Sequence, residues 1–236
     1  MTTDLRLPPR RLRIVVMPVR ARIFMLLSLA VLTVRVPADP IAARGPEIQA
    51  GADDAEWQRL FHALSDKGAV FSHVTERRWL KVRKQPVELA VEMRLSPQRG
   101  LSLHYEDRTV IVDEKGVLLR DARGRSREVP RDDRAPAVNA WLLPVLRFDL
   151  PALEKSFQLF GAREGDSWRL DFVPREAGGT SGNADKSVGT IVVQGAGDAI
   201  SRIDFQPKRD VRIEILIGDA QTHVEFSADD LRRFFR

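Results

Sequence analysis

The stretch 86-PVELAVEMRLSPQRGLSLHYE-106 decides the fold of this chain. Apolar side chains alternate with mostly charged ones from Val87 to Leu95, and after a Pro-Gln-Arg-Gly break the alternation returns from Leu101 to Tyr105. An apolar–polar alternation with a period of two residues is typical of strands that have one buried and one solvent-exposed face, and the break is typical of a turn. The stretch therefore predicts two neighbouring antiparallel strands that share an apolar face.

Short runs of the same kind continue on both sides of this stretch, joined mostly by turns that contain Pro or Gly, and predict an antiparallel meander. Two three-residue segments that end in glycine, Glu114–Gly116 and Ala122–Gly124, have the composition of hairpin loops. The expected strands are Ala69–Val82, Val87–Leu95, Leu101–Glu106, Thr109–Asp113, Val117–Asp121, Arg125–Val129, Phe157–Ala162, Trp168–Val173, Thr190–Gln194, Ile200–Gln206, Val211–Ile217 and His223–Phe226.

Three segments have helical signals instead. Trp57, Leu60, Phe61 and Leu64 recur at helical spacing after a potential Asp53-Asp54 cap, which predicts an amphipathic helix. Residues 131–155 interrupt the strands with apolar residues at helical spacing and a Pro144 placed to kink them; Asp149 and Pro151 open a second short helix there. The tail from residue 227 predicts a last helical turn.

The fold class expected is mainly β (α+β): a curved antiparallel incomplete β-barrel of about eleven strands, with an N-terminal helix and a central helical lid over its concave side. Open sheets of this length curl or close. The alternation predicts a concave apolar lining of Val87, Leu89, Val91, Met93, Leu101, Leu103, Tyr105, Ile191, Val193, Ile213 and Ile215, with Trp141 contributed by the lid.

The formal charge of +5 is concentrated at the N-terminus. Residues 1–43 hold seven Arg and two Asp, which leaves 38 − 7 = 31 basic and 33 − 2 = 31 acidic side chains in the remainder. A neutral domain gives no reason to expect nucleic acid as a partner.

The N-terminus itself is expected to be a signal peptide. Ile23–Val34 is an apolar run bracketed by arginines and is too short for a spanning helix. We expect a signal peptide at residues 1–43, cleaved near Ala42 or Ala43, with Met17 as an alternative start, and a single domain at residues 44–236. The chain has no cysteine, which excludes disulfides and a lipid-modified N-terminal Cys. The expected location is the periplasm.

Catalytic and metal-binding patterns are weak. The four histidines have no ligand spacing, and the sequence Gly165–Trp168, which contains Ser167, is similar to an esterase nucleophile motif but falls where a hairpin turn is expected. Gly195–Asp198 lacks the following helix that a dinucleotide-binding loop needs. We therefore expect no enzyme activity, no cofactor and no metal.

The order of elements resembles that of the LolA-like carriers, the periplasmic outer-membrane lipoprotein-carrier family. The resemblance covers roughly residues 54–230 and rests on the Trp168–Pro174 strand, the Phe71–Arg77 segment and their order in the chain. It implies an incomplete barrel with a helical lid that holds acyl chains in an apolar cavity and shuttles lipidated cargo towards the outer membrane without covalent chemistry. The strands after Leu101 differ, which indicates a divergent subfamily and leaves the cargo open.

The resemblance also implies partners and a latch. An inner-membrane exporter and an outer-membrane acceptor are the implied partners, and a monomer is expected. An arginine on an early strand ties the family's lid shut, and Arg77 or Arg78 matches it by position. The alternative function is a lipid-sensing or regulatory interaction module with the same fold.

Overall fold

The computed structural model describes residues 41–48, 55–129, 138–175 and 189–236, without the side chains of residues 138–141 and Lys208. Residues 1–40 of the expected signal peptide lie outside the described residues. Within the described part, no helix is both long and apolar enough to cross a membrane.

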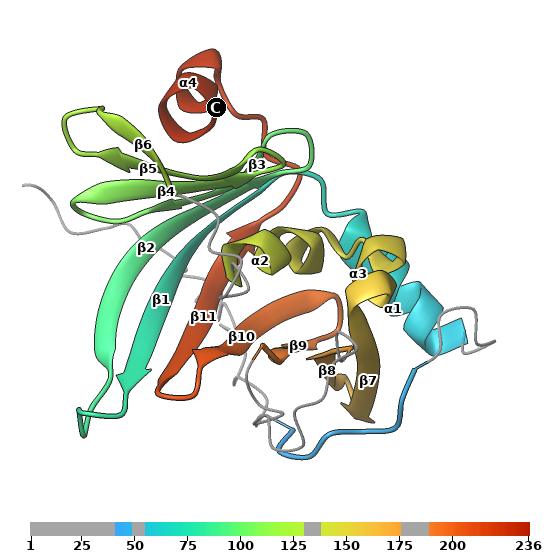
Figure 1. The fold of residues 1–236 in the computed structure, drawn as a ribbon. Helices are drawn as coiled ribbons and strands as arrows, with labels where there is room; N and C mark the ends of the chain where they lie inside the picture. The colour runs from blue at the N-terminus through green and yellow to red at the C-terminus, as the bar shows by residue number, and fades with distance from the viewer. Residues whose placement is uncertain (1–40, 49–54, 130–137, 176–188) are drawn as a thin grey trace, which may run out of the picture. The chain divides into compact units, whose positions relative to one another are not determined.

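An eleven-stranded antiparallel sheet in the order β6-β5-β4-β3-β2-β1-β11-β10-β9-β8-β7 forms the body of the domain. It is not closed, since β6 and β7 are its two edges, and it curls strongly (Figure 1). The predicted fold class is thus confirmed. The strands are β1 Val70–Leu80, β2 Val87–Ser96, β3 Gly100–His104, β4 Arg108–Asp113, β5 Gly116–Asp121, β6 Ser126–Val129, β7 Phe157–Glu164, β8 Ser167–Pro174, β9 Ile191–Ala196, β10 Ala199–Lys208 and β11 Val211–Gln221.

The opening stretch forms β2 and β3 as predicted, with Met93 opposite Leu103 and Leu95 opposite Leu101. The predicted strand His223–Phe226 is wrong: β11 runs on to Gln221, and His223 then takes a left-handed backbone with φ 54°. A left-handed residue cannot continue a strand, so the chain leaves the sheet there.

Three helices lie on the concave face: α1 Ala55–Ser65, α2 Val138–Arg147 and α3 Leu150–Ser156 (Figure 1). Their buried side chains and the inward side chains of the strands belong to one hydrophobic cluster. Pro144 stands inside α2, and Asp149 caps α3, where its Oδ1 accepts a hydrogen bond from the Ala152 amide at 3.2 Å. The predicted helical insert is confirmed, and it covers the face that the sequence placed on the concave side.

A fourth helix, α4 Ala228–Phe234, packs on the opposite, outer face of the sheet. Arg120 Nη2 donates to the Phe235 carbonyl at 3.2 Å, and the His104 ring lies edge-on to Phe234 with centroids 5.3 Å apart. Phe235 is 1% exposed, and Ile111 and Leu118 are buried. The tail therefore covers apolar residues that would otherwise face water on the outside of β4 and β5.

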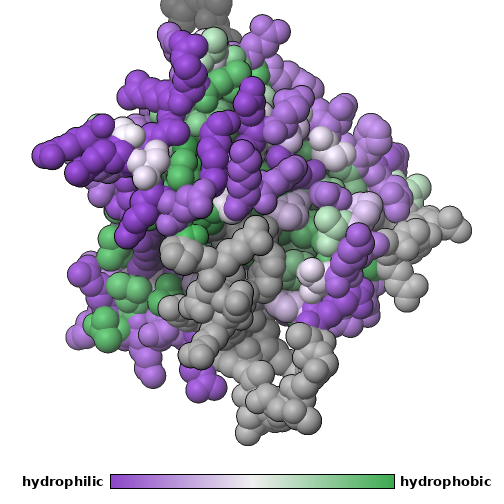
Figure 2. All heavy atoms as spheres, turned by 45° about the horizontal axis from the view of Figure 1, so that its top comes forward, coloured by the Kyte–Doolittle hydropathy of each residue, from purple (hydrophilic) through white to green (hydrophobic). Residues whose placement is uncertain are grey.

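The surface between these elements is mostly charged. Figure 2 shows one face on which hydrophilic side chains predominate and apolar ones appear in small groups. Of the described residues, the large apolar side chains that are exposed are Trp79, Val82 and Val129. The first two lie at and just beyond the end of β1, away from the helices on the concave face.

Candidate functional site

The inner wall of the sheet collects the predicted lining residues from strands that are far apart in sequence. Strand register places Met93 beside Leu103, and Ile203 between Val193 and Ile215. Both halves of the sheet therefore contribute to one continuous apolar surface. The lining residues that are buried are Val91, Met93, Leu101, Leu103, Tyr105, Ile191, Val193 and Ile215; Leu89 and Ile213 are partly buried against the core, and Val87 is intermediate. Trp141 lies in α2, and its side chain is outside the described residues.

The helices occupy this wall in the structure. Wall residues share a cluster with side chains of α1 and of the helical insert, among them Leu60, Phe61, Leu143, Val145 and Leu153. A ligand that used the wall would therefore take the place of helix side chains, because the wall is packed against them.

The link between α2 and α3 is conformationally strained. Phe148 has φ 49°, a left-handed conformation that a bulky residue adopts at a cost of about 1–3 kcal/mol. Burial of its ring to 4% exposure holds it there. At the end of α2, Arg147 Nη1 lies 3.8 Å from Glu114 Oε1 in the β4–β5 turn. The two short helices thus meet at a strained turn close to the Arg147–Glu114 ion pair.

A polar cluster interrupts the apolar wall. Tyr105 Oη donates to Glu76 Oε2 at 2.5 Å, and Arg78 Nε donates to Glu76 Oε1. Glu76 and Tyr105 are 5% and 6% exposed, whereas about a third of the Arg78 side chain (35%) reaches solvent. Together the three side chains form a cluster at the edge of the wall, with a buried carboxylate and phenol and a partly exposed guanidinium.

The electrostatics of this cluster favour the charged pair with a neutral phenol. Burial and the neighbouring Glu76 charge raise the pKa of Tyr105 far above its ordinary value. Burial lowers the pKa of Arg78, but its hydrogen bond to Glu76 and the charge of Glu76 outweigh burial, so the Arg78 pKa lies above its ordinary value. The cluster is therefore a carboxylate–guanidinium pair with a protonated phenol beside it.

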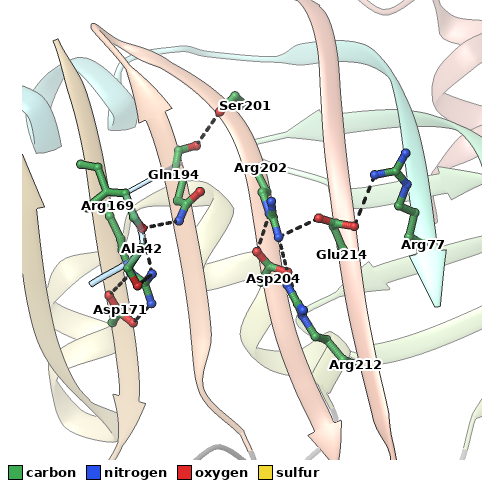
Figure 3. Close-up of polar contacts among 11 residues, drawn as sticks. Ala42, Arg77, Arg169, Asp171, Gln194, Ser201, Arg202, Asp204, Arg212 and Glu214 are labelled. Atoms are coloured by element: carbon green, nitrogen blue, oxygen red, sulfur yellow. Dashed lines mark hydrogen bonds and ion pairs between the residues drawn. The ribbon is translucent and has the colours of Figure 1, made fainter. Parts of the chain in front are cut away.

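The two arginines that the sequence left open point in opposite directions. Arg78 shares the inner face with Glu76, since both alternate in phase with the buried Val74. Arg77 lies on the outer face, where its Nε donates to Glu88 Oε1 at 2.8 Å. Its Nη1 lies 3.7 Å from Glu214 Oε2, as Figure 3 shows. Of the two, Arg78 is the one placed beside the apolar wall.

Sequence reasoning missed an ionic ladder on the outer face of β8, β10, β11 and β1 (Figure 3). Its ion pairs are Arg169–Asp171, Arg202–Asp204, Arg202–Glu214, Arg212–Asp204 and Arg77–Glu214. The signal was present as three repeats of an arginine and an acidic residue two positions later, in Trp168–Phe172, Ser201–Phe205 and Val211–Ile215. Residues two apart on a strand share a face, so the first two repeats pair internally, and the repeats of β10 and β11 also pair with each other.

The candidate nucleophile motif is a turn. Gly165 has φ 59°, and Ser167 is the first residue of β8, opposite Glu164 in the β7–β8 hairpin. Among the described residues, no group of three or more His, Asp or Glu side chains is placed to hold a metal ion.

Comparisons with known proteins give structural likeness only. No protein-family model matches the chain, and no curated protein matches it in sequence. Solved structures that align with it include a domain assigned to outer-membrane lipoprotein sorting from Vibrio parahaemolyticus, with 8% identity, a TM-score of 0.37, and coverage of 74% of this chain and 93% of that one.

Two further structures align over the same share of this chain, 74%. A DUF1329 family protein from Desulfovibrio piger has 9% identity, a TM-score of 0.41 and 95% of its own length covered. A LolA superfamily protein from Nitrosomonas europaea has 6% identity, a TM-score of 0.38 and 96% covered. Similarity at this level carries no conclusion about function. What the structure itself establishes is an open, curled sheet of eleven antiparallel strands with helices on its concave face.

Proposed function

We propose that this protein is a periplasmic carrier that binds the acyl chains of lipoproteins or other lipidated cargo on the inner wall of its sheet and shuttles them towards the outer membrane without covalent chemistry. The observation that carries the proposal is the nature of the cover. The concave apolar wall is closed by short separate helices and not by a second sheet, so the cover can move while the sheet keeps its hydrogen bonds.

Loading is an exchange of one apolar partner for another. Moving an acyl chain out of water gains about 0.8 kcal/mol per methylene buried. Displaced side chains of α2, such as Leu143 and Leu146, lose a comparable apolar contact with the wall. The net free energy is then small compared with either term, which is what a carrier that must also release its cargo requires.

The insert has features suited to such a movement. Pro144 removes one backbone hydrogen bond from α2, and the strained Phe148 joins α2 to α3. Moving the helices apart would relieve that strain. The Arg147–Glu114 ion pair restrains α2 weakly, because surface ion pairs contribute about 0–1 kcal/mol.

Arg78 supplies the polar end of the proposed site. A guanidinium held beside the wall by Glu76 can donate hydrogen bonds to the ester, amide or phosphate oxygens next to an acyl chain. Arg77 is paired with Glu88 on the outer face and does not reach the proposed site. An inner-membrane exporter and an outer-membrane acceptor are the partners that the family resemblance implies, with the protein acting as a monomer.

A matched pair of variants tests the wall. Leu89→Asp places a charge on the partly buried inner face, whereas Ala90→Asp places the same charge on the exposed neighbouring position of β2. We expect a dansyl-labelled fatty acid to bind the purified residue 44–236 chain, to bind Leu89→Asp at least about tenfold more weakly, and to bind Ala90→Asp as it binds the unchanged protein. Equal binding by both variants would place the ligand elsewhere.

Extraction of lipids from the protein purified from its native envelope separates the carrier from the sensing alternative. Stoichiometric acylated molecules in the mass spectrum support the carrier. Absence of any acyl species, together with no binding of the fatty-acid probe, rejects it in favour of a regulatory interaction module.

A further inference from the structure

The chain's own residues 41–48, termed the N-terminal strap, lie across the outer face of β8 and β9 and along β7. Arg169 Nη1 donates to the carbonyls of Ile41 and Ala42 at 2.9 and 2.8 Å, and Gln194 Nε2 donates to the Ile41 carbonyl at 3.1 Å (Figure 3). The acceptors are main-chain oxygens and the donors are side chains of the sheet. These contacts therefore recognise an extended backbone whatever the residues at positions 41 and 42 are.

One side chain of the strap is recognised as well. Arg44 Nε lies 3.6 Å from Asp171 Oδ1, and its guanidinium carbon lies 5.0 Å from the centre of the Phe160 ring. Asp171 is 1% exposed and is also bound by Arg169. A buried carboxylate beside an aromatic face selects a basic side chain at this position.

The rest of the strap is fastened to the edge strand β7. Gly161 N donates to the Pro46 carbonyl at 3.0 Å, and Ile48 N donates to the Leu159 carbonyl at 2.8 Å. Gly45 crosses so close to β7 that an added Cβ would lie 1.7 Å from the Gly161 oxygen. This anchor holds residues 45–48 independently of the contacts made by Ile41 and Ala42.

The site is larger than the segment that fills it. A groove of about 510 Å³ runs beside Ile41 and Ala42 and continues past Gln194 to Arg202, Asp204 and Arg212. Gln194 is 7% exposed, and its Oε1 accepts no hydrogen bond within the part of the chain that the structure describes. The amide thus uses its donor on a carbonyl and leaves its acceptor free, which complements a peptide unit that offers both C=O and N–H.

We propose that this groove is a binding site for an extended peptide that carries a basic residue three positions after its first bound carbonyl, and that Ile41–Arg44 is a replaceable occupant. Cleavage near Ala42 or Ala43, as the sequence predicts, would remove both bound carbonyls. Arg44 would remain next to the anchor of residues 45–48 on β7. The processed protein then presents Arg169 and Gln194 to a peptide segment of a partner protein. This site lies on the opposite face of the sheet from the acyl wall, so it does not depend on the carrier function.

Peptide binding to two forms of the chain, one starting at Pro37 and one at Gly45, which lacks every residue of the proposed occupant, tests the proposal. The probe is a fluorescein-labelled Ile-Ala-Ala-Arg peptide, amidated at its C-terminus, and the readout is fluorescence anisotropy. We expect saturable binding to the short form and binding at least about tenfold weaker to the long form, whose own strap competes. Gln194→Ala, Arg169→Ala and Asp171→Asn in the short form should each weaken binding about tenfold or more.

Arg125→Ala is the matched control, because Arg125 pairs only with Asp121 among the described residues and is far from the groove in the sheet order. It should leave binding unchanged. No binding to the folded short form at millimolar peptide, or equal binding to the Gln194→Ala protein, overturns the proposal.

A second measurement decides the matter if the short form does not fold. Trypsin can cut after Arg44 only when that side chain leaves Asp171, so the rate of this cut in the full chain reports detachment of the strap. Gln194→Ala and Arg169→Ala should accelerate it, whereas Arg125→Ala should not. Equal rates in all four proteins mean that residues 41 and 42 are not held by this site, which contradicts the proposal.

Discussion

Tyr105 is the only tyrosine in the chain, so its ionisation can be followed without interference from other phenols. Because burial and the Glu76 charge raise its pKa, the folded protein should keep the phenol protonated well above the ordinary tyrosine value of about 10. The unfolded chain has neither the burial nor the fixed Glu76 neighbour, and its tyrosine should titrate near the ordinary value.

The sign of the stability change follows from these two pKa values. Below about pH 10 both states keep the proton, and the Tyr105–Glu76 hydrogen bond contributes its full stabilisation. Above that pH the unfolded state releases a proton that the folded state retains, so stability falls by about 1.4 kcal/mol per pH unit until the folded pKa is reached. Alkaline unfolding should therefore coincide with tyrosinate formation.

The assay is an alkaline titration followed by two signals. Near-ultraviolet absorbance reports tyrosinate formation, and far-ultraviolet circular dichroism reports loss of the folded structure. In the native protein the absorbance should rise only as the dichroism is lost, and in concentrated urea it should rise at the ordinary pKa. Glu76→Gln removes the charge and should bring the Tyr105 pKa down while burial keeps it above ordinary. A phenol that ionises at its ordinary pKa in protein that is still folded would refute the buried Glu76–Tyr105 cluster.

Three further predictions concern stability in urea unfolding. Arg202→Ala leaves the buried Glu214 with Arg77, at 3.7 Å, as its one ion-pair partner among the described residues, and should cost about 2–3 kcal/mol. Arg125→Ala, whose partner Asp121 is on the surface, should cost less than about 1 kcal/mol, and equal costs would contradict the ladder. Gly161→Ala puts a Cβ 2.3 Å from Ile48 Cδ1 and 2.5 Å from Trp57 Cζ2, and this overpacking should cost about 1–3 kcal/mol of stability. Unchanged stability would mean that the strap and α1 do not both contact Gly161. Phe235→Ala should cost about 3 kcal/mol because Phe235 is 1% exposed, whereas the exposed Arg232→Ala control should leave stability unchanged. Unchanged stability of Phe235→Ala would show that the C-terminal tail does not cover the outer face.

The strand pattern was predictable because period-two alternation and turn residues are local signals. β2, β3 and the hairpins around Gly116 and Gly165 appear where the sequence placed them. The strand expected at His223–Phe226 did not form. The apolar residues in this segment are as compatible with a connection leading into α4 as they are with a strand. Local composition cannot distinguish these two outcomes.

The candidate site was harder to predict because it depends on register. Glu76-Arg77-Arg78 places charges on both faces, and only pairing with β2 and β11 decides which arginine faces inward: Arg78 lies opposite Val87 and Ile213, and Arg77 opposite Glu88 and Glu214. Apolar alternation also looks the same whether a wall is packed by helices or lined for a ligand. The packing of α2 against the wall therefore could not be read from the strands.

Photo-crosslinking with a fatty acid that carries a diazirine in its acyl chain would show directly which residues of the protein contact a bound acyl chain. We expect labels on the inward positions of β2, Leu89, Val91 and Met93, and on α2 side chains that the ligand displaces. Labels confined to the outward positions Glu88, Glu92 and Arg94, or no specific label on the sheet, would contradict acyl binding at the concave wall.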